Sequence, residues 1–146
     1  MSLLLKHPDY KDFKNLSLKR IEEAKCLLDN KQFSGAYYLA GYSVEFALKA
    51  CYCKTVPKKS FPPKRNIYDK LYKHDLNGLL DVSGIKHEFE KSLTENNDLN
   101  AKWEIIKDWN EESRYAIMIE NDARPMIEAI IGVLQHFFCK FASIMV

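Results

Sequence analysis

The sequence has no long hydrophobic run of the kind that marks a targeting segment or a membrane span. The N-terminal apolar run is only Leu3-Leu4-Leu5, and Lys6 follows it directly, so it is too short for a signal peptide. The C-terminal apolar stretch is interrupted by polar and charged side chains, whereas a membrane-spanning helix needs about 20 apolar residues in succession. We therefore expect a cytoplasmic protein with no membrane association.

The sequence also lacks the short motifs that hold metals and cofactors. It contains four cysteines, with Cys51 and Cys53 two apart, but no C-x-x-C pair and no His/Cys set with zinc spacing. It has no glycine-rich phosphate loop, no G-x-S-x-G and no H-E-x-x-H. We therefore expect no metal ion and no cofactor, and we interpret the cysteines as reduced thiols in a reducing compartment.

The composition indicates a single soluble helical domain. The net charge of +2, from 22 basic and 20 acidic residues, favours no particular partner. A chain of 146 residues is long enough to bury its own core as one domain. There are only five glycines and five prolines, and the long apolar patterns repeat at a period near 3.6. We therefore predict an all-α, up-and-down helical bundle of about five helices, with residues 1–146 in one domain.

One stretch, Phe33 to Cys53, is apolar on nearly every side and forms the centre of the predicted bundle. A helix with one face in water would show a polar half, so this helix is expected to run between the others. We expect Ser34 to cap its start and the helix to end near Thr55. Its only internal charges, Glu45 and Lys49, are four apart in the order that favours a helix ion pair. Catalysis would need a second carboxylate or a nucleophile beside this pair, and the sequence identifies none.

Apolar periodicity and capping residues predict the remaining helices. The expected elements are Asp12–Asp29, Asp75–Val82 capped by Asp75, Ile85–Glu95, an apolar stripe from Leu99 to Trp109, and a final helix that Asn121 or Asp122 caps. The residues between Asn110 and Asn121 fit no single pattern.

A basic stretch, Lys54 to Lys73, is the only long segment expected to be irregular. Its cations, which include Lys64 and Arg65, are interleaved with aromatic side chains. A phosphate backbone with unpaired bases would need this combination of side chains. The alternative is a solvated loop whose aromatic side chains tuck beneath it.

Several short segments come in a fixed order along the chain: Tyr37-Tyr38-Leu39-Ala40, Glu45-Phe46-Ala47-Leu48-Lys49-Ala50, Lys73-His74-Asp75-Leu76, Leu79-Leu80, Trp109 and Ser113-Arg114-Tyr115. In this order they resemble the HEPN (higher eukaryotes and prokaryotes nucleotide-binding) domains, over roughly residues 16–141. The resemblance implies a helical homodimer. In the ribonucleases of the family it also implies an Arg, followed after four to six residues by a His, that cleaves RNA without a metal between two facing subunits.

The chain departs from that pattern after Arg114. The fifth, sixth and seventh residues beyond it are Ile119, Glu120 and Asn121, and none is a histidine. Arg114 has two open interpretations: a contact to phosphate or nucleotide, or an ion pair with Glu111 or with a carboxylate on another helix. An arginine suits phosphate because its planar fork matches the phosphate oxygens.

Four other residues also have alternative interpretations. Trp109 and Tyr115 are either core or dimer-interface aromatics or platforms for stacking bases. His74 and Asp75 form an acid–base pair, or else Asp75 caps a helix and His74 lies at the mouth of the loop.

These observations favour a homodimeric binding module for RNA, a nucleotide or a partner protein, without efficient catalysis. By resemblance, its setting is toxin–antitoxin pairing with a nucleotidyltransferase-type protein, or phage defence. The final helix carries more apolar surface than a lone helix in a small bundle needs, which also favours dimerisation: Phe137, Phe138, Phe141, Ile144 and Met145. The alternative is a metal-free ribonuclease that uses Arg114 with Asn121, Glu120 or His74. The expected binding residues are Arg114, Tyr115, Asn121, Glu45, Lys49, His74, Asp75, Lys64 and Arg65.

Overall fold

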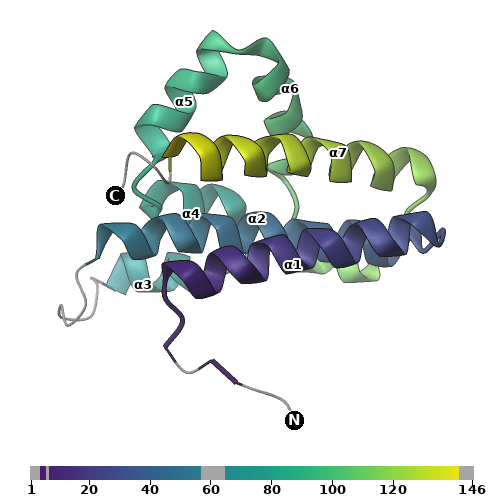
Figure 1. The fold of residues 1–146 in the computed structure, drawn as a ribbon, viewed down its shortest axis with the longest axis horizontal. Coiled ribbons are helices and arrows are strands. Elements are labelled where there is room, and N and C mark those ends of the chain that lie inside the picture. The colour runs from purple at the N-terminus through teal and green to yellow at the C-terminus, as the bar shows by residue number, and fades with distance from the viewer. Residues whose placement is uncertain (1–3, 6, 57–64, 142–146) are drawn as a thin grey trace.

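The computed structural model describes residues 4–5, 7–56 and 65–141, and this part of the chain is helical with no strand (Figure 1). The all-α prediction is confirmed, but the described part holds seven α-helices rather than about five. One of the additional helices, residues 65–71, lies inside the stretch expected to be irregular. The elements are α1 (Tyr10–Asp29), α2 (Phe33–Thr55), α3 (Arg65–Leu71), α4 (Leu76–Val82), α5 (Lys86–Glu95), α6 (Asn97–Ile106), the 3₁₀-helix η1 (Glu111–Tyr115), α7 (Glu120–His136) and the π-helix η2 (Phe137–Phe141).

The first two helices form an antiparallel hairpin, as their short connection predicts (Figure 1). The start of α1 is fixed by a reciprocal cap, in which the side chains of Asp9 and Asp12 each accept the other residue's backbone N–H. The connection turns at Lys31, whose φ of 61° is uncommon for a residue other than glycine. Ser17 then joins the helices, because its hydroxyl donates to the carbonyl oxygen of Ser43 at 2.6 Å.

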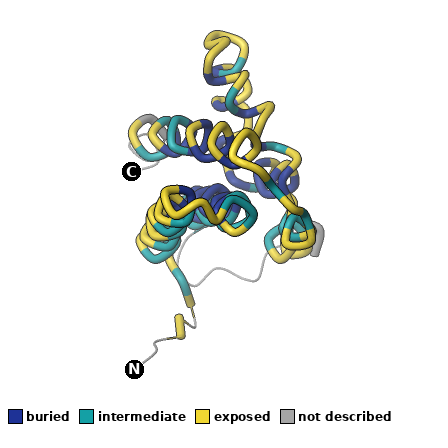
Figure 2. The backbone as a smooth tube through the Cα atoms, turned by 90° about the vertical axis from the view of Figure 1, so that its right-hand side faces the viewer, coloured by how far each residue is buried: buried dark blue, intermediate teal, exposed yellow. Residues whose placement is uncertain are grey.

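The α2 helix runs through the middle of the molecule, as the sequence predicts. Ten of its residues are buried, most of them small, and they let the neighbouring helices approach closely. Figure 2 shows the buried positions on α1, α2 and α7 turned toward one another, with exposed positions on the outside. The core therefore lies where α7 packs over the α1–α2 hairpin.

The α5–α6 pair stands on the far side of α7 from that hairpin (Figure 1). Its two helices are separated at Asn96, whose side chain accepts the N–H of Leu99 and caps α6. The Phe89 ring of α5 lies 5.0 Å from the rings of Trp103 and Phe137. Phe137 is thus fully buried within the subunit, so it is not available for the dimer contact expected of it. Ile144 and Met145, which were expected to share that contact, lie outside the described residues.

Two helix starts differ from the sequence prediction. Gln32, not Ser34, precedes α2, because the Ser34 hydroxyl accepts the backbone N–H of Met118 at 2.9 Å. The α7 helix begins after Ile119 rather than at Asn121 or Asp122. The Asp122 carboxylate reaches back to accept the N–H of Ile119 at 3.0 Å, which stabilises this earlier start.

Gly84 ends the α4 region with a φ of 86°, which glycine adopts at little cost. No helix among the described residues combines the length and the apolar character needed to cross a bilayer.

Candidate binding site on the α2–η1 face

A buried carboxylate at the centre of α2 anchors the site. Glu45 is 1% exposed, although it is ionisable. Its Oε2 accepts a hydrogen bond from Lys49 Nζ at 3.3 Å, one turn along the helix, so the ion pair expected from their spacing is present. Burial of a charge is costly unless it is paired and hydrogen-bonded, and here the second carboxylate oxygen also has a partner.

That second partner is His74, whose Nδ1 lies 2.5 Å from Glu45 Oε1. A carboxylate only accepts, so Nδ1 carries the proton when Glu45 is ionised, and Nε2 is left for other contacts. The side chain of His74 is 39% exposed, so one edge of the ring reaches solvent. The acid–base pair considered for His74 and Asp75 is wrong, because Asp75 caps α4 by accepting the N–H of Asn77 at 3.1 Å.

Aromatic side chains connect this carboxylate–histidine pair to η1. The Tyr42 ring packs edge-on against His74 at 5.7 Å and against Trp109 at 4.9 Å. The hydroxyls of Tyr38 and Tyr42 are 3.0 Å apart. Burial and then this hydrogen bond raise the pKa of Tyr42, so its hydroxyl stays protonated throughout the neutral range.

Trp109 completes this aromatic cluster, and Gly41 leaves the space that the indole ring occupies. A Cβ built on Gly41 would lie 2.0 Å from the indole ring, so no other residue fits here unless Trp109 moves. The ring is 3% exposed, which makes it a core residue rather than a stacking platform.

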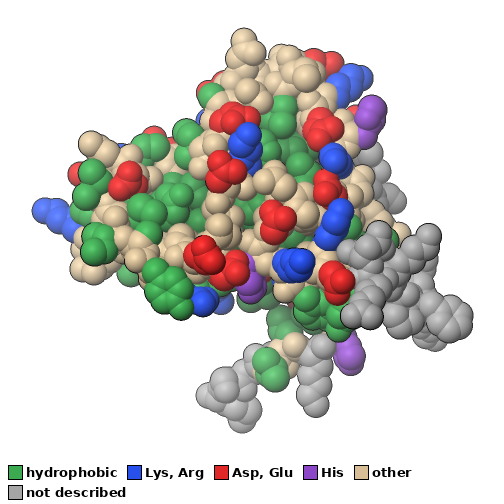
Figure 3. All heavy atoms as spheres, turned by 180° about the vertical axis from the view of Figure 1, so that it is seen from behind, with side chains coloured by type: hydrophobic (Ala, Val, Ile, Leu, Met, Phe, Trp, Pro, Cys, Tyr) green, Lys and Arg blue, Asp and Glu red, His purple; other side chains and the backbone are tan. Residues whose placement is uncertain are grey.

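An open groove of about 480 Å³ lies beside His74. Its lining is more acidic than basic: Tyr72, Lys73, His74, Asp75, Asn110, Glu111 and Glu112. Figure 3 shows acidic and basic side chains interspersed over this face. A polyanion would be repelled by the three carboxylates in the groove itself, so any phosphate contact on this face falls at its edge.

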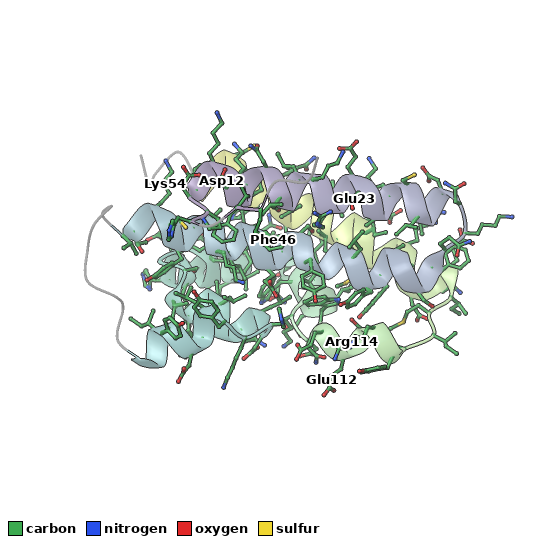
Figure 4. All side chains as sticks on the ribbon, turned by 90° about the horizontal axis from the view of Figure 1, so that it is seen from below. Asp12, Glu23, Phe46, Lys54, Glu112 and Arg114 are labelled. Atoms are coloured by element: carbon green, nitrogen blue, oxygen red, sulfur yellow. The ribbon has the colours of Figure 1, made fainter. Side chains whose placement is uncertain are left out.

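Arg114 lies on η1, beside the groove residue Glu112 and below α2 in Figure 4. It makes no ion pair with a carboxylate in the described part of the chain, so the expected pair with Glu111 does not form. Glu111 instead lines the groove. The guanidinium lies over the Tyr115 ring, 4.8 Å from its centroid. Hydrogen bonding to Tyr115 and then to Tyr38 raises the pKa of Arg114.

Tyr115 itself is 77% exposed, so it is not a core residue. Together, Arg114 and Tyr115 present a cation and an aromatic face to solvent.

The other expected site residues lie apart from this pair. Asn121 is exposed in the first turn of α7, and Glu120 forms an ion pair with Arg124 at 2.7 Å. Arg65 begins α3, and Lys64 lies outside the described residues.

Two cations of the basic stretch have partners within the subunit. Lys54 lies over the Tyr10 ring at 4.3 Å, and Lys70 pairs with Asp81 at 3.1 Å. The part of this stretch that the structure describes therefore forms no continuous basic surface.

The sequence missed the contact between Glu45 and His74. The two residues are 29 positions apart, and no local spacing predicts a bond that depends on where the α3–α4 connection folds back. Within the described residues, no group of three or more His, Cys, Asp or Glu side chains is arranged to hold a metal ion. In comparisons with protein-family models, curated proteins and solved structures, nothing matches this chain.

Proposed function

We propose that the chain is a HEPN-like homodimeric module that binds RNA or a nucleotide through Arg114 and Tyr115, without efficient cleavage. One observation carries this proposal: an arginine with no carboxylate partner in the described part of the chain lies over a tyrosine ring that is 77% exposed. The contacts of Arg114 within the subunit are with Tyr115 and Tyr38, so no carboxylate compensates its positive charge and the guanidinium can still bind an anionic ligand.

The chemistry of this pair suits a nucleotide unit. The planar guanidinium can donate two parallel hydrogen bonds to a phosphate, and a lysine cannot reproduce that geometry. An exposed aromatic ring offers a stacking surface to a base regardless of its identity. Because the adjoining groove is acidic, we expect contact with a short stretch of single-stranded RNA rather than a long track.

We expect no efficient catalysis, because the histidines are not arranged as they are in the ribonucleases of the family. No histidine follows Arg114 within the family spacing, and His136 lies at the other end of α7 from Glu120, about 24 Å along the helix. The ring of His136 packs near Phe89, at 6.1 Å, inside the helical layer that includes α5. Acid–base catalysis needs a titrating group within hydrogen-bond reach of the moving proton, and neither Glu120 nor Asn121 supplies one beside Arg114.

The test is binding of a short labelled single-stranded RNA at several salt concentrations without metal. We expect weak binding that falls as salt rises, and Arg114→Ala should lose most of it and reduce the salt slope by about one. The matched control is Arg20→Ala, which removes the same charge from α1, where Arg20 pairs with Glu23. Equal losses in the two variants, or binding that does not respond to salt, would contradict the proposal.

A second candidate is metal-free cleavage with His74 in the role that the family gives to its histidine. The observation that favours it is the contact between the buried Glu45 carboxylate and His74 Nδ1. This contact fixes the imidazole ring and leaves Nε2 for proton transfer. It requires that RNA enter the groove despite the carboxylates. Rapid metal-free cleavage by the wild type that His74→Gln abolishes would establish this candidate in place of the binding-only one.

The resemblance also gives the proposal a setting. A helical module of this kind would pair with a nucleotidyltransferase-type antitoxin or act in phage defence. Co-expression with a nucleotidyltransferase encoded next to it, followed by purification through a tag on one protein, tests the pairing directly.

A further inference from the structure

A cavity of about 390 Å³ lies beside the C-terminal half of α2. Its walls come from α1, from α2 and from the end of α3, and they include Phe13, Lys49, Tyr52, Cys53 and Tyr72. In Figure 4, Asp12 and Lys54 mark this end of the α1–α2 hairpin. Cavities of ~300–1,000 Å³ with mainly apolar walls and a few polar groups are typical of small-molecule sites. The chemistry of the walls therefore indicates which ligand this cavity suits.

Aromatic rings line the cavity from three parts of the chain. Phe13 stacks against Phe46 of α2, with the ring centroids 6.1 Å apart, and this contact holds the Phe13 ring in place. Tyr72 packs on Tyr68 at 4.4 Å and is 70% exposed, so it forms part of the rim. Burial raises the pKa of Tyr52 above its ordinary value of 10.0, so its hydroxyl stays protonated and can donate a hydrogen bond. These walls suit a flat apolar ring.

Lys49 supplies the charge of the cavity. Among the described residues that line it, only Lys49 has a permanently charged side chain. This side chain is 18% exposed, so its ammonium group is held largely away from bulk water. Glu45 Oε2 accepts one of its three N–H donors at 3.3 Å, and the other two remain for a ligand. His7, on the segment before α1, adds a second group that can carry a positive charge.

The lining adds no negative charge that would oppose an anion. Burial raises the pKa of Cys53, so its thiol stays protonated at neutral pH. Asp9 and Asp12 are close enough to raise it further, but their carboxylates accept backbone N–H groups in the cap at the start of α1. The cavity therefore differs from the groove beside His74, where carboxylates outnumber cations.

We propose that this cavity binds a small aromatic monocarboxylate, with its ring against Phe13 and Tyr52 and its carboxylate on Lys49. The site is additional to the RNA or nucleotide contact proposed at Arg114, which lies on η1. A single ammonium group whose charge is partly compensated by Glu45 suits a ligand with one negative charge. A phosphate dianion would bring a second negative charge close to Glu45, so a carboxylate fits better.

Titration with probes that share a phenyl ring tests the ligand class. The probes are phenylacetate, its neutral counterpart phenylacetamide, and the dianion phenyl phosphate, and NMR of the isotope-labelled protein measures each affinity. We expect phenylacetate to bind at least about tenfold more tightly than phenylacetamide, because only its carboxylate forms a charged hydrogen bond with Lys49. Equal affinities for these two probes, or no binding of phenylacetate, would overturn the site. Tighter binding of phenyl phosphate than of phenylacetate would overturn the choice of a monocarboxylate.

Two pairs of variants locate the bound probe. Lys49→Met keeps an apolar stem but removes the charge, so phenylacetate should lose its advantage over phenylacetamide. The matched control is Lys54→Met, which removes the same charge from the same helix, where Lys54 lies over the Tyr10 ring. This control should bind phenylacetate as the wild type does.

The second pair leaves the contact between Lys49 and Glu45 intact. Cys53→Phe places a ring in the cavity and should abolish binding of phenylacetate, whereas Cys53→Ala should retain it. Equal losses in Lys49→Met and Lys54→Met, or undiminished binding in Cys53→Phe, would overturn the proposal. Binding that is lost in Arg114→Ala but unchanged in Lys49→Met would place the probe on η1 and overturn it as well.

Discussion

Gly41→Ala offers the sharpest test of how the site is packed. Alanine normally stabilises a helix interior relative to glycine by about 1 kcal/mol, and Gly41 lies near the middle of α2. Helix propensity alone therefore predicts a more stable protein. The packing predicts the opposite, because an added Cβ would lie 2.0, 2.1 and 2.3 Å from three atoms of the Trp109 indole.

The indole must move to accept that methyl group. Real side chains do not approach so closely, and Trp109 is a rigid ring that is 3% exposed and packs against Tyr42 at 4.9 Å. Displacing a buried aromatic side chain costs about 3–5 kcal/mol when its contacts are lost. After subtraction of the helix gain, the net loss is about 2–4 kcal/mol. For a chain of this length, that lowers the melting temperature by roughly 5–15 °C.

Urea unfolding followed by circular dichroism measures the free energy, and tryptophan fluorescence reports the indole. In a Trp103→Phe background the emission comes from Trp109 alone, and it should shift to the red as the ring gains water. The matched control is Gly35→Ala on the same helix, where the nearest atom is Leu27 Cδ1 at an ordinary 3.6 Å. That variant should be neutral or stabilised by up to about 1 kcal/mol. A Gly41→Ala protein as stable as the control would refute the packing argument.

Three further perturbations follow from the burial and pairing of charged groups. Glu45→Gln removes a buried charge from its two partners, Lys49 and His74. We expect urea unfolding to show a loss of about 3 kcal/mol in the free energy of unfolding, at the low end for buried pairs because both partners reach solvent. Burial raises the pKa of Cys51 to about 12, so at pH 8 a thiol reagent should label Cys26 in the native protein and Cys51 only after unfolding. A hydrogen bond from Lys86 holds the pKa of Asp81 in the folded protein below its ordinary value of 3.8. The Asp81 carboxylate therefore stabilises the fold fully above pH 3.8, and this contribution is lost as the pH falls through the lower pKa of the folded state. Because the pair is exposed, the gap in unfolding free energy between wild type and Asp81→Asn should be at most about 1 kcal/mol at pH 7 and should close in acid.

Local periodicity accounts for the parts of the fold that the sequence predicts well. The central position of α2 follows from a segment that is apolar on all sides, and the Glu45–Lys49 pair follows from a spacing of four. Both depend only on residues within one helix. The cap at Asp75 is local in the same way, since its carboxylate reaches a backbone N–H two residues on.

Most of the features that the sequence did not predict depend on contacts between different helices and loops. The Ser34 hydroxyl would suit a helix start, but it lies where the N–H of Met118, 84 positions later, needs an acceptor. Phe137 likewise packs against Phe89 of α5 in the core, so one of the apolar residues that indicated dimerisation is used within the subunit. A competing partner from a distant segment overrides a local preference in both cases.

The segment after Arg114 carries no clear periodic signal. Residues 115–119, YAIMI, are all apolar, so they show neither the alternation of a strand nor the period of an amphipathic helix, and this is why residues 110–121 fitted no pattern. In the structure Tyr115 ends η1 and residues 116–119 belong to no helix. Only the placement of Met118 against Ser34 decides which side faces solvent.

The binding-only proposal and the HEPN resemblance predict different numbers of bound ligands. In each subunit Arg114 lies over the ring of Tyr115, so one subunit supplies both the cation and the aromatic ring. If that pair binds a nucleotide unit by itself, a homodimer carries two separate ligand sites rather than one composite cleft. We therefore expect calorimetric titration with a mononucleotide or short RNA to give one ligand per subunit with equal affinities. One ligand per dimer, lost in Arg114→Ala, would instead place both arginines in a single cleft and favour the facing arrangement that the HEPN resemblance implies.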